Sequence, residues 1–380
     1  MCSILGIINL KDNLEPNEQV LKRINKLLNH RGPDNEGFYF DKKVSFAFNR
    51  LSIMDLNKGN QPIENKNIVT IFNGEIYNFK EIRSELKKIG HKFDTNSDSE
   101  IIAPAFSEWG IKCIEKFNGM FAIAIYDKNY SKVYLVRDRV GIKPLYYSML
   151  NNQIIFSSEI KGIINSPNFE KKINYNSLSS YFSFRYPYGN NNVFFENIEK
   201  LAPGSILEID LNKKDTKKYS YWSIPGISDL SNKKEDYYLA KLEDLLNKSV
   251  KKQLVSDAPL GVFLSGGLDS SIISSMASKQ LSSKLKTYSV GFEEKNYDET
   301  NKAQEIAKFL GTEHTEIIVG KRDFLNNLEN IINIKDVPVS IPHEYPMYLL
   351  SKKMKEEIKV VLSGEGADEL FGGYARVQNS

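Results

Sequence analysis

The stretch Gly261–Ser271, GVFLSGGLDSS, indicates how the second half of the chain folds. It opens with a short apolar run, Val262–Leu264, which is typical of a buried strand. Two glycines and Asp269 follow, and the next residues have the apolar spacing of a helix. The pattern predicts a strand, a glycine-rich loop and a helix. In such a unit the loop N–H groups and the helix N-terminus favour an anion at one point.

The charges of this loop differ from those of the common P-loop. That motif needs a lysine for the terminal phosphates, and this loop has none. It carries Asp269 instead, and a carboxylate beside a phosphate is repelled unless a cation lies between them. The loop therefore predicts Mg²⁺. The alternative is a glycine turn with a capping aspartate. Two glycines alone would fit that alternative, but the full SGGLDS string is a far more specific signal.

A second loop of the same design follows a later strand, KVVLSG, with SGEGADE at Ser363–Glu369. Strands and helices alternate between the two loops, which predicts a parallel sheet with helices on both faces. Ligands of such sheets bind beyond the carboxyl ends of the strands. Asp269 and Asp368 are therefore expected to share a Mg²⁺ ion. The alternative for Asp368 and Glu369 is the acidic first turn of a helix.

Composition limits the class of protein. The chain has 380 residues, 41% hydrophobic and 26% charged, with a net charge of +3. This balance gives no argument for a nucleic-acid or membrane partner. No run approaches a membrane span, and no signal peptide is recognised at the N-terminus. The two cysteines, Cys2 and Cys113, provide neither a disulfide framework nor zinc spacing. We expect a cytoplasmic enzyme.

Cys2 is a candidate nucleophile. A small residue after Met1 allows the initiator to be removed, which would leave Cys2 with a thiol and a free α-amine. That amine has an ordinary pKa near 8, so it can accept the thiol proton near neutral pH. The alternative is that a cysteine at the second position is incidental, and Cys2 considered alone would favour that alternative. The rest of the sequence favours a catalytic nucleophile.

The remainder of the N-terminal half reads as strands with a few helices. Strand-like segments recur up to Asp210, and we expect two stacked sheets flanked by helices. Cys113 is expected to pack in a helix. The domain joint is placed near Lys213–Ser231, which gives domains of residues 1–212 and 232–380.

Two motifs and the N-terminus together resemble a known family. SGGLDS resembles the signature loop of the ATP pyrophosphatases. With SGEGADELFGGY at Ser363–Tyr374 and Met-Cys-Ser at the start, nearly all of the chain resembles the glutamine-dependent asparagine synthetases. The resemblance implies a class II glutamine amidotransferase domain, an N-terminal nucleophile hydrolase built as an αββα sandwich of antiparallel sheets. An α/β parallel-sheet ATP-pyrophosphatase domain would follow it.

The resemblance also implies roles for the N-terminal half. Cys2 would attack the glutamine amide, and the Asn73 side chain and the Gly74 N–H would form the oxyanion hole. The implied ligands of the glutamine carboxylate and ammonium are Arg50, Glu75 and Asp98. Each has an ordinary alternative: a strand-surface charge for Arg50, a helix N-cap for Asp98, and a turn for Asn73-Gly74.

For the second half, the resemblance implies a site for ATP and Mg²⁺. The implied pyrophosphate and Mg²⁺ contacts are Ser265, Gly267, Asp269 and Ser270. The implied adenylate contacts are Leu264, Val290, Ser363, Gly364 and Glu365, with Glu365 also near the reacting carboxylate. Asp368 would be a second Mg²⁺ ligand.

The implied reaction is the ATP-dependent amidation of aspartate with glutamine as nitrogen donor, in a possible homodimer. Family members continue well beyond the point reached by Ser380, so we expect the ATP half to be incomplete. Three alternatives stay open: another carboxylate as acceptor, a fragment with glutaminase activity only, and an inactive nucleotide-binding module.

Overall fold

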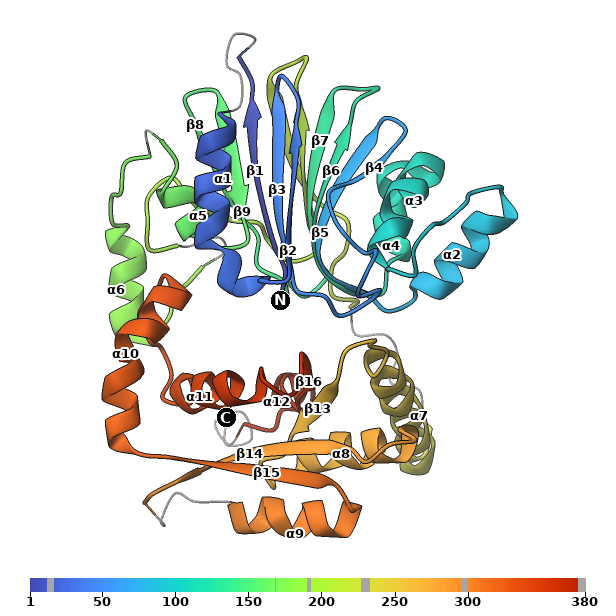
Figure 1. Cartoon of the computed structure of the whole chain (residues 1–380), viewed down its shortest axis with the longest axis vertical. Helices are drawn as coiled ribbons and strands as arrows, with labels where there is room; N and C mark the ends of the chain where they lie inside the picture. Colours follow the sequence, from blue (N-terminus) through green and yellow to red (C-terminus); the bar gives the residue numbers. More distant parts are fainter. Residues whose placement is uncertain (12–16, 168, 190–192, 227–232, 295–299, 375–380) are drawn as a thin grey trace. The chain divides into compact units, whose positions relative to one another are not determined.

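A computed structural model describes residues 1–11, 17–167, 169–189, 193–226, 233–294 and 300–374. The chain forms two compact units (Figure 1). Unit 1 comprises Met1–Ser228 and Lys335–Val337, and unit 2 comprises Asp229–Ile334 and Pro338–Ser380. Each unit has its own hydrophobic cores.

Unit 1 contains two six-stranded sheets. The first has the strand order β10-β8-β9-β1-β3-β2, and the second has the order β12-β11-β7-β6-β5-β4. All strand pairs in both sheets are antiparallel. The strands of the first sheet are β1 (Ser3–Asn9), β2 (Asn35–Phe40), β3 (Val44–Arg50), β8 (Tyr146–Leu150), β9 (Gln153–Ser157) and β10 (Glu199–Lys200). Those of the second are β4 (Ile63–Asn65), β5 (Ile68–Ile76), β6 (Gly119–Asp127), β7 (Lys132–Arg137), β11 (Ser205–Asp210) and β12 (Asp215–Ser220).

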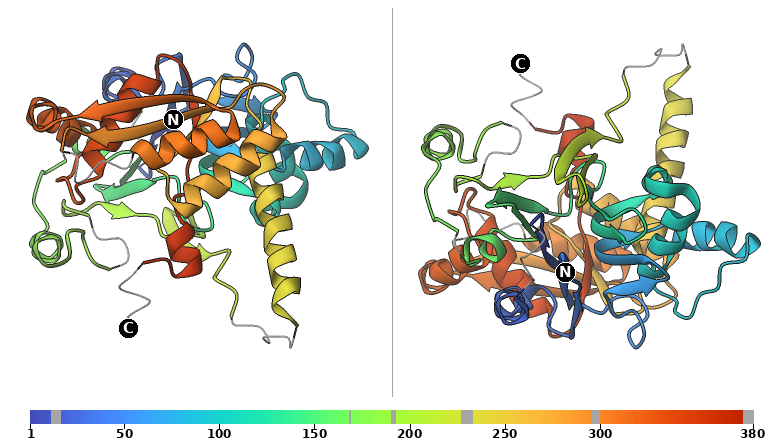
Figure 2. Two further views of the ribbon diagram at one scale, coloured as in Figure 1. Left: turned by 90° about the horizontal axis from the view of Figure 1, so that it is seen from below. Right: turned by 90° about the horizontal axis from the view of Figure 1, so that it is seen from above.

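Helices cover the outer faces of both sheets. Apolar side chains of α1 (Glu18–Leu27) and α5 (Lys161–Ile164) pack on the first sheet. Those of α2 (Phe79–Lys88), α3 (Ile102–Trp109) and α4 (Cys113–Lys116) pack on the second. The view from above in Figure 2 shows α1 and the α3–α4 pair on opposite sides of the sheets. The helix α6 (Tyr175–Phe184) follows α5. The expected αββα arrangement of antiparallel sheets is confirmed.

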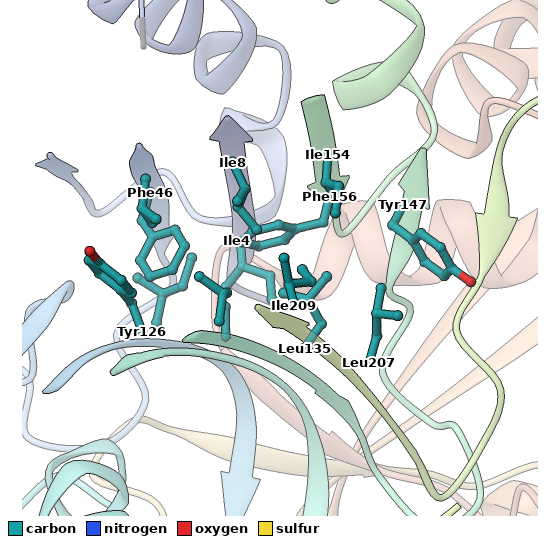
Figure 3. Packing of buried hydrophobic residues seen from close by; sticks show 14 of the residues in the cluster. Ile4, Ile8, Phe46, Tyr126, Leu135, Tyr147, Ile154, Phe156, Leu207 and Ile209 are labelled. Carbon is teal, nitrogen blue, oxygen red and sulfur yellow. The ribbon is translucent and has the colours of Figure 1, made fainter. Parts of the chain in front are cut away.

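The core between the sheets fixes β1, the strand that follows Cys2. Figure 3 shows Ile4 and Ile8 of β1 among apolar side chains of both sheets. Phe46 and Phe156 meet edge to face with ring centroids 5.7 Å apart. The Phe156 ring lies over Gly6, where an added Cβ would be 2.3 Å from a ring carbon. Truncation of such a buried aromatic ring typically costs about 3–5 kcal/mol, so the position of β1 is strongly specified.

Two local interpretations differ from the structure. The strand β5 continues to Ile76, so Asn73 and Gly74 lie in a paired strand, and the turn given as their alternative is wrong. The polar stretch Lys213–Lys218, expected at the joint, contributes to β12 of the second sheet. In each case pairing with a neighbouring strand outweighs the local sequence signal.

Unit 2 is built on a four-stranded parallel sheet of order β15-β14-β13-β16. Its strands are β13 (Leu260–Phe263), β14 (Lys286–Phe292), β15 (Glu313–Val319) and β16 (Val360–Leu362). Its helices are α7 (Glu235–Gln253), α8 (Leu268–Gln280), α9 (Thr300–Leu310), α10 (Lys321–Lys335), α11 (Glu344–Met354) and α12 (Ala367–Phe371). Figure 1 shows α11 on one face of β14 and β15 and α9 on the other. The expected parallel sheet with helices on both faces is confirmed.

None of the helices in the described ranges combines the length and the apolar composition that crossing a membrane requires.

Candidate active sites

The candidate nucleophile Cys2 precedes β1 at the edge of the inter-sheet core. Because Ser3 pairs with Asn49 of β3, the ends of the two strands bring Cys2 and Arg50 together. The Leu51 N–H donates to Cys2 Sγ at 3.4 Å, and the Leu51 carbonyl lies 3.7 Å from the same sulfur. Burial raises the pKa of the thiol, and the Leu51 N–H and the amino terminus offset only part of this effect. A base is therefore needed to activate the sulfur.

Asn73 and Gly74 lie near the end of β5, paired with Ala122 and Phe121 of β6. Asn73 is 1% exposed, and its Nδ2 has no hydrogen-bond partner among the described residues. A buried donor without an acceptor costs about 1–3 kcal/mol, so it is retained where a ligand can supply the acceptor. A Cβ on Gly74 would lie 2.1 Å from the Met120 carbonyl oxygen, so the close approach of β6 requires glycine here.

Two carboxylates lie beside this strand end: the half-buried Glu75 and the buried Asp98. The Ile76 N–H donates to Asp98 Oδ2 at 2.8 Å. Asp98 stands at the N-cap position of the 3₁₀ turn Ser99–Ile101, but its side chain makes no capping bond there. Burial raises the pKa of Asp98 to about 6 although this N–H favours the charged form. Burial, and then the charge of Asp98, also raise the pKa of Glu75. Such a pair attracts a cation.

Arg50 is buried, and a loop wraps around its guanidinium group. Its Nη1 donates to Asn60 Oδ1 at 2.8 Å and to the Leu56 carbonyl at 3.4 Å. Its Nη2 donates to the carbonyls of Asp55 at 2.6 Å and Met54 at 3.1 Å. Of its N–H groups, only Nε has no partner among the described residues. Arg50 therefore organises the loop as well as carrying a positive charge next to Cys2.

Three further charged residues surround the start of the chain, and sequence reasoning assigned no role to them. Arg31 Nε donates to the Cys2 carbonyl at 3.0 Å, and its Nη1 forms an ion pair with Glu159 at 2.8 Å. Lys143 Nζ lies 3.3 Å from Met1 Sδ. The stretches HRGPD and RDRVGIKPLYY, which contain Arg31 and Lys143, are visible in the sequence, but their proximity to Cys2 is not.

In unit 2, both glycine-rich loops border one cavity. Because β13 and β16 are adjacent and parallel, their carboxyl ends place the two loops side by side. The cavity has a volume of about 260 Å³. It is lined by Phe263, Ser265, Gly267, Asp269, Ser270, Met347, Ser363, Gly364, Glu365, Gly366, Asp368, Glu369 and Tyr374. The predicted ATP residues Leu264 and Val290 are not in this lining; Leu264 is a buried core residue.

Hydrogen bonds within the first loop fix its shape. The hydroxyl groups of Ser265 and Ser270 lie 2.9 Å apart, and the Gly267 N–H donates to Ser265 Oγ at 3.3 Å. The helix α8 begins at Leu268, so Asp269 lies in its first turn. A Cβ on Gly364 would lie 2.9 Å from the Asp269 Cβ, which shows how closely the two loops approach. In the second loop, Asp368 and Glu369 lie in the first turn of α12, as the helix alternative predicted.

Comparison with known proteins agrees with this division of sites. Residues 1–222 match the family described as glutamine amidotransferase domain, and residues 241–380 match that described as asparagine synthase. Asparagine synthetase [glutamine-hydrolyzing] 1 of Bacillus subtilis is 37% identical over 98% of this chain and 59% of its own length. The putative asparagine synthetase 2 of Methanocaldococcus jannaschii is 35% identical over 98% of this chain and 76% of its own. The chain belongs to the glutamine-hydrolysing asparagine synthetase family.

The two candidate sites lie one in each matched segment. The chain spans 59% of the length of the first Bacillus relative and 52% of the length of a second one, asparagine synthetase [glutamine-hydrolyzing] 2. That second relative is 36% identical over 99% of this chain.

Proposed function

We propose that unit 1 hydrolyses glutamine to glutamate and ammonia. The Cys2 sulfur attacks the side-chain amide carbon while the α-amine accepts the thiol proton. The C–N bond breaks, that proton leaves with the nitrogen as ammonia, and water then hydrolyses the thioester to glutamate. Asn73 Nδ2 and the Gly74 N–H stabilise the oxyanion. The observation that carries this proposal is the buried Asn73 amide, whose N–H groups have no acceptor within the described part of the chain.

The same proposal assigns the ends of glutamine to the remaining residues of the site. Glu75 and Asp98 bind its ammonium group, because two neighbouring carboxylates with raised pKa values are each more stable as anions beside a cation. The positive charge of Arg50 attracts its carboxylate, and Nε offers the N–H group that makes no bond to the loop. Recognition of both the ammonium and the carboxylate group would select a free amino acid over a glutamine residue within a peptide.

We further propose that unit 2 binds ATP and forms an acyl-adenylate. An oxygen of the aspartate carboxylate attacks the α-phosphorus, pyrophosphate leaves, and ammonia then displaces AMP to give asparagine. Ser265, Gly267 and Ser270 would contact the pyrophosphate. Ser363, Gly364 and Glu365 would line the adenylate, and Leu264 and Val290 would contact adenine through their backbones. The shared cavity between the two loops supports this assignment.

Mg²⁺ fits the chemistry of this cavity. Asp269 and Asp368 both line it, while the described residues contain no cluster of three metal-binding side chains. Mg²⁺ is commonly held by one or two carboxylates together with substrate phosphates, so these two aspartates would suffice. When bound, it would neutralise negative charge on the phosphates.

The two reactions are tested separately on the same chain. Cys2→Ala is expected to abolish glutamate release from glutamine while the protein stays folded; retained release would remove Cys2 as the nucleophile. Pyrophosphate release from ATP-Mg²⁺ is then measured with ammonia and aspartate, with other carboxylic acids in parallel. Release only with aspartate supports the synthetase. Release only with another acid identifies a different acceptor, and no release with any acid contradicts the ligase proposal for this chain.

A further inference from the structure

Lys143 is a buried cation beside the start of the chain that the proposed mechanism leaves unused. It lies in the loop between β7 and β8 and is 6% exposed. Its N–H donates to Asp138 Oδ2 at 2.9 Å, and its carbonyl accepts from Arg137 Nε at 2.8 Å. The backbone that carries the side chain is therefore fixed. The ammonium group is held 3.3 Å from the sulfur of Met1, the residue that must be removed to free Cys2.

The charge of Lys143 is not matched by an ion pair. Within the described ranges no carboxylate pairs with it, whereas Arg31, the other cation at this point, pairs with Glu159 at 2.8 Å. A buried charge is normally paired, because its transfer from water is costly. Burial and then Arg31 lower the pKa of Lys143, and the charges of Glu75, Cys2 and Asp138 act in the opposite direction. The unmatched ammonium group adds a positive charge beside Cys2, which lowers the pKa of the thiol in opposition to the charge of Glu75.

We infer that Lys143 is a positioning residue for the nucleophile: its ammonium charge keeps the α-amine of Cys2 neutral, and so able to accept the thiol proton. The inference rests on the glutaminase function proposed above. A positive charge disfavours the protonation of a nearby amine, and an amine already protonated near neutral pH could not act as the base. Removal of Met1 places the reactive amine on Cys2, whose carbonyl already contacts Arg31.

The electrostatics of the amino terminus are consistent with this role. The pKa of the Met1 amino group is lowered to about 5; burial is the largest cause, and the charges of Arg31 and Lys143 contribute to the same lowering. The Cys2 thiolate and Asp34 act in the opposite direction. Of the two cations, Arg31 forms an ion pair with Glu159, whereas Lys143 forms none within the described ranges. A purely structural lysine, in contrast, could be replaced by a neutral side chain of similar length without changing the titration of the amine.

The test measures the amine itself and does not depend on activity. In the full chain carrying Cys2→Ala, the α-amine is labelled with trace acetic anhydride across a pH series. The N-terminal peptide is then quantified by mass spectrometry, which also shows that Met1 has been removed. With Lys143→Met added, the midpoint of labelling should rise by about one pH unit or more, the size expected for a unit charge at a partly buried site. With Lys143→Arg the midpoint should stay near that of the parent.

Lys200→Met is the matched control. Lys200 is also a lysine whose pKa is lowered mainly by burial, but it does not act on the amino terminus. An unchanged midpoint in Lys143→Met, or an equal rise in Lys200→Met, would overturn the inference. If Lys143→Met does not fold, Lys143→Gln takes its place with the same expected rise. A parent chain that releases no glutamate would refute the glutaminase proposal, while the labelling shift would still decide the role of Lys143.

Discussion

Glu159 provides the sharpest test of the charge network around Cys2, because its contribution to stability can be calculated. Its carboxylate accepts from His30 and Arg31, and its side chain is 11% exposed. Burial by itself would raise its pKa, but the bond from His30 and the charge of Arg31 outweigh burial and lower the pKa from 4.5 to about 2. At roughly 1.4 kcal/mol per pKa unit, the difference corresponds to about 3 kcal/mol of stability.

The sign of the pH dependence follows from the lowered pKa. The contribution of Glu159 is complete above its unfolded pKa and is lost as the pH falls from 4.5 toward about 2. Glu159→Gln should therefore reduce the free energy of unfolding by about 3 kcal/mol at pH 7. At pH 3.5 the deficit should be smaller by about 1.4 kcal/mol, because the parent has by then lost that part of its advantage.

Urea unfolding followed by tryptophan fluorescence measures this difference in the correct unit, since both tryptophans, Trp109 and Trp222, belong to unit 1. Glu18→Gln is the control, because Glu18 and Lys22 form an exposed pair whose loss should cost less than about 0.5 kcal/mol. A loss at pH 7 no larger than that of the control, or a deficit that does not shrink at pH 3.5, would refute the reasoning.

Three further outcomes are expected. Gly74→Ala should lower the melting temperature, and it should lower glutamate release by about a hundredfold or more. The added Cβ would lie 2.1 Å from the Met120 carbonyl oxygen, so the oxyanion donor must shift. An unchanged melting temperature together with unchanged glutamate release would contradict the placement of Gly74. The KM for glutamine should rise as the pH falls below about 6, where Asp98 is protonated and loses its attraction for the ammonium group; a constant KM between pH 7 and 5 would exclude Asp98 as a ligand. Gly364→Ala should abolish pyrophosphate release, because the added Cβ would lie 2.9 Å from the Cβ of Asp269. Glutamate release is the internal control. Normal pyrophosphate release would show that the two loops do not act together.

The sequence by itself determined the elements whose signal is local. The apolar run, glycines and acid of SGGLDS specify a strand, loop and helix, and the alternation of strands and helices specifies a parallel sheet. From these two facts it follows that the loops containing Asp269 and Asp368 lie at the same edge of that sheet. Cys2 stood out because a second-position cysteine brings a thiol and an amine together, whatever the fold.

Only the tertiary structure decided what depends on contacts between distant segments. Asn73 and Gly74 read locally as a turn, but pairing with β6 holds them in a strand, since a sheet contributes more than the local preference of two residues. Arg31, Lys143 and Glu159 meet at the start of β1 because the folding of the two sheets brings their separate loops there. The raised pKa values of Glu75 and Asp98 likewise arise from burial, which no sequence pattern states.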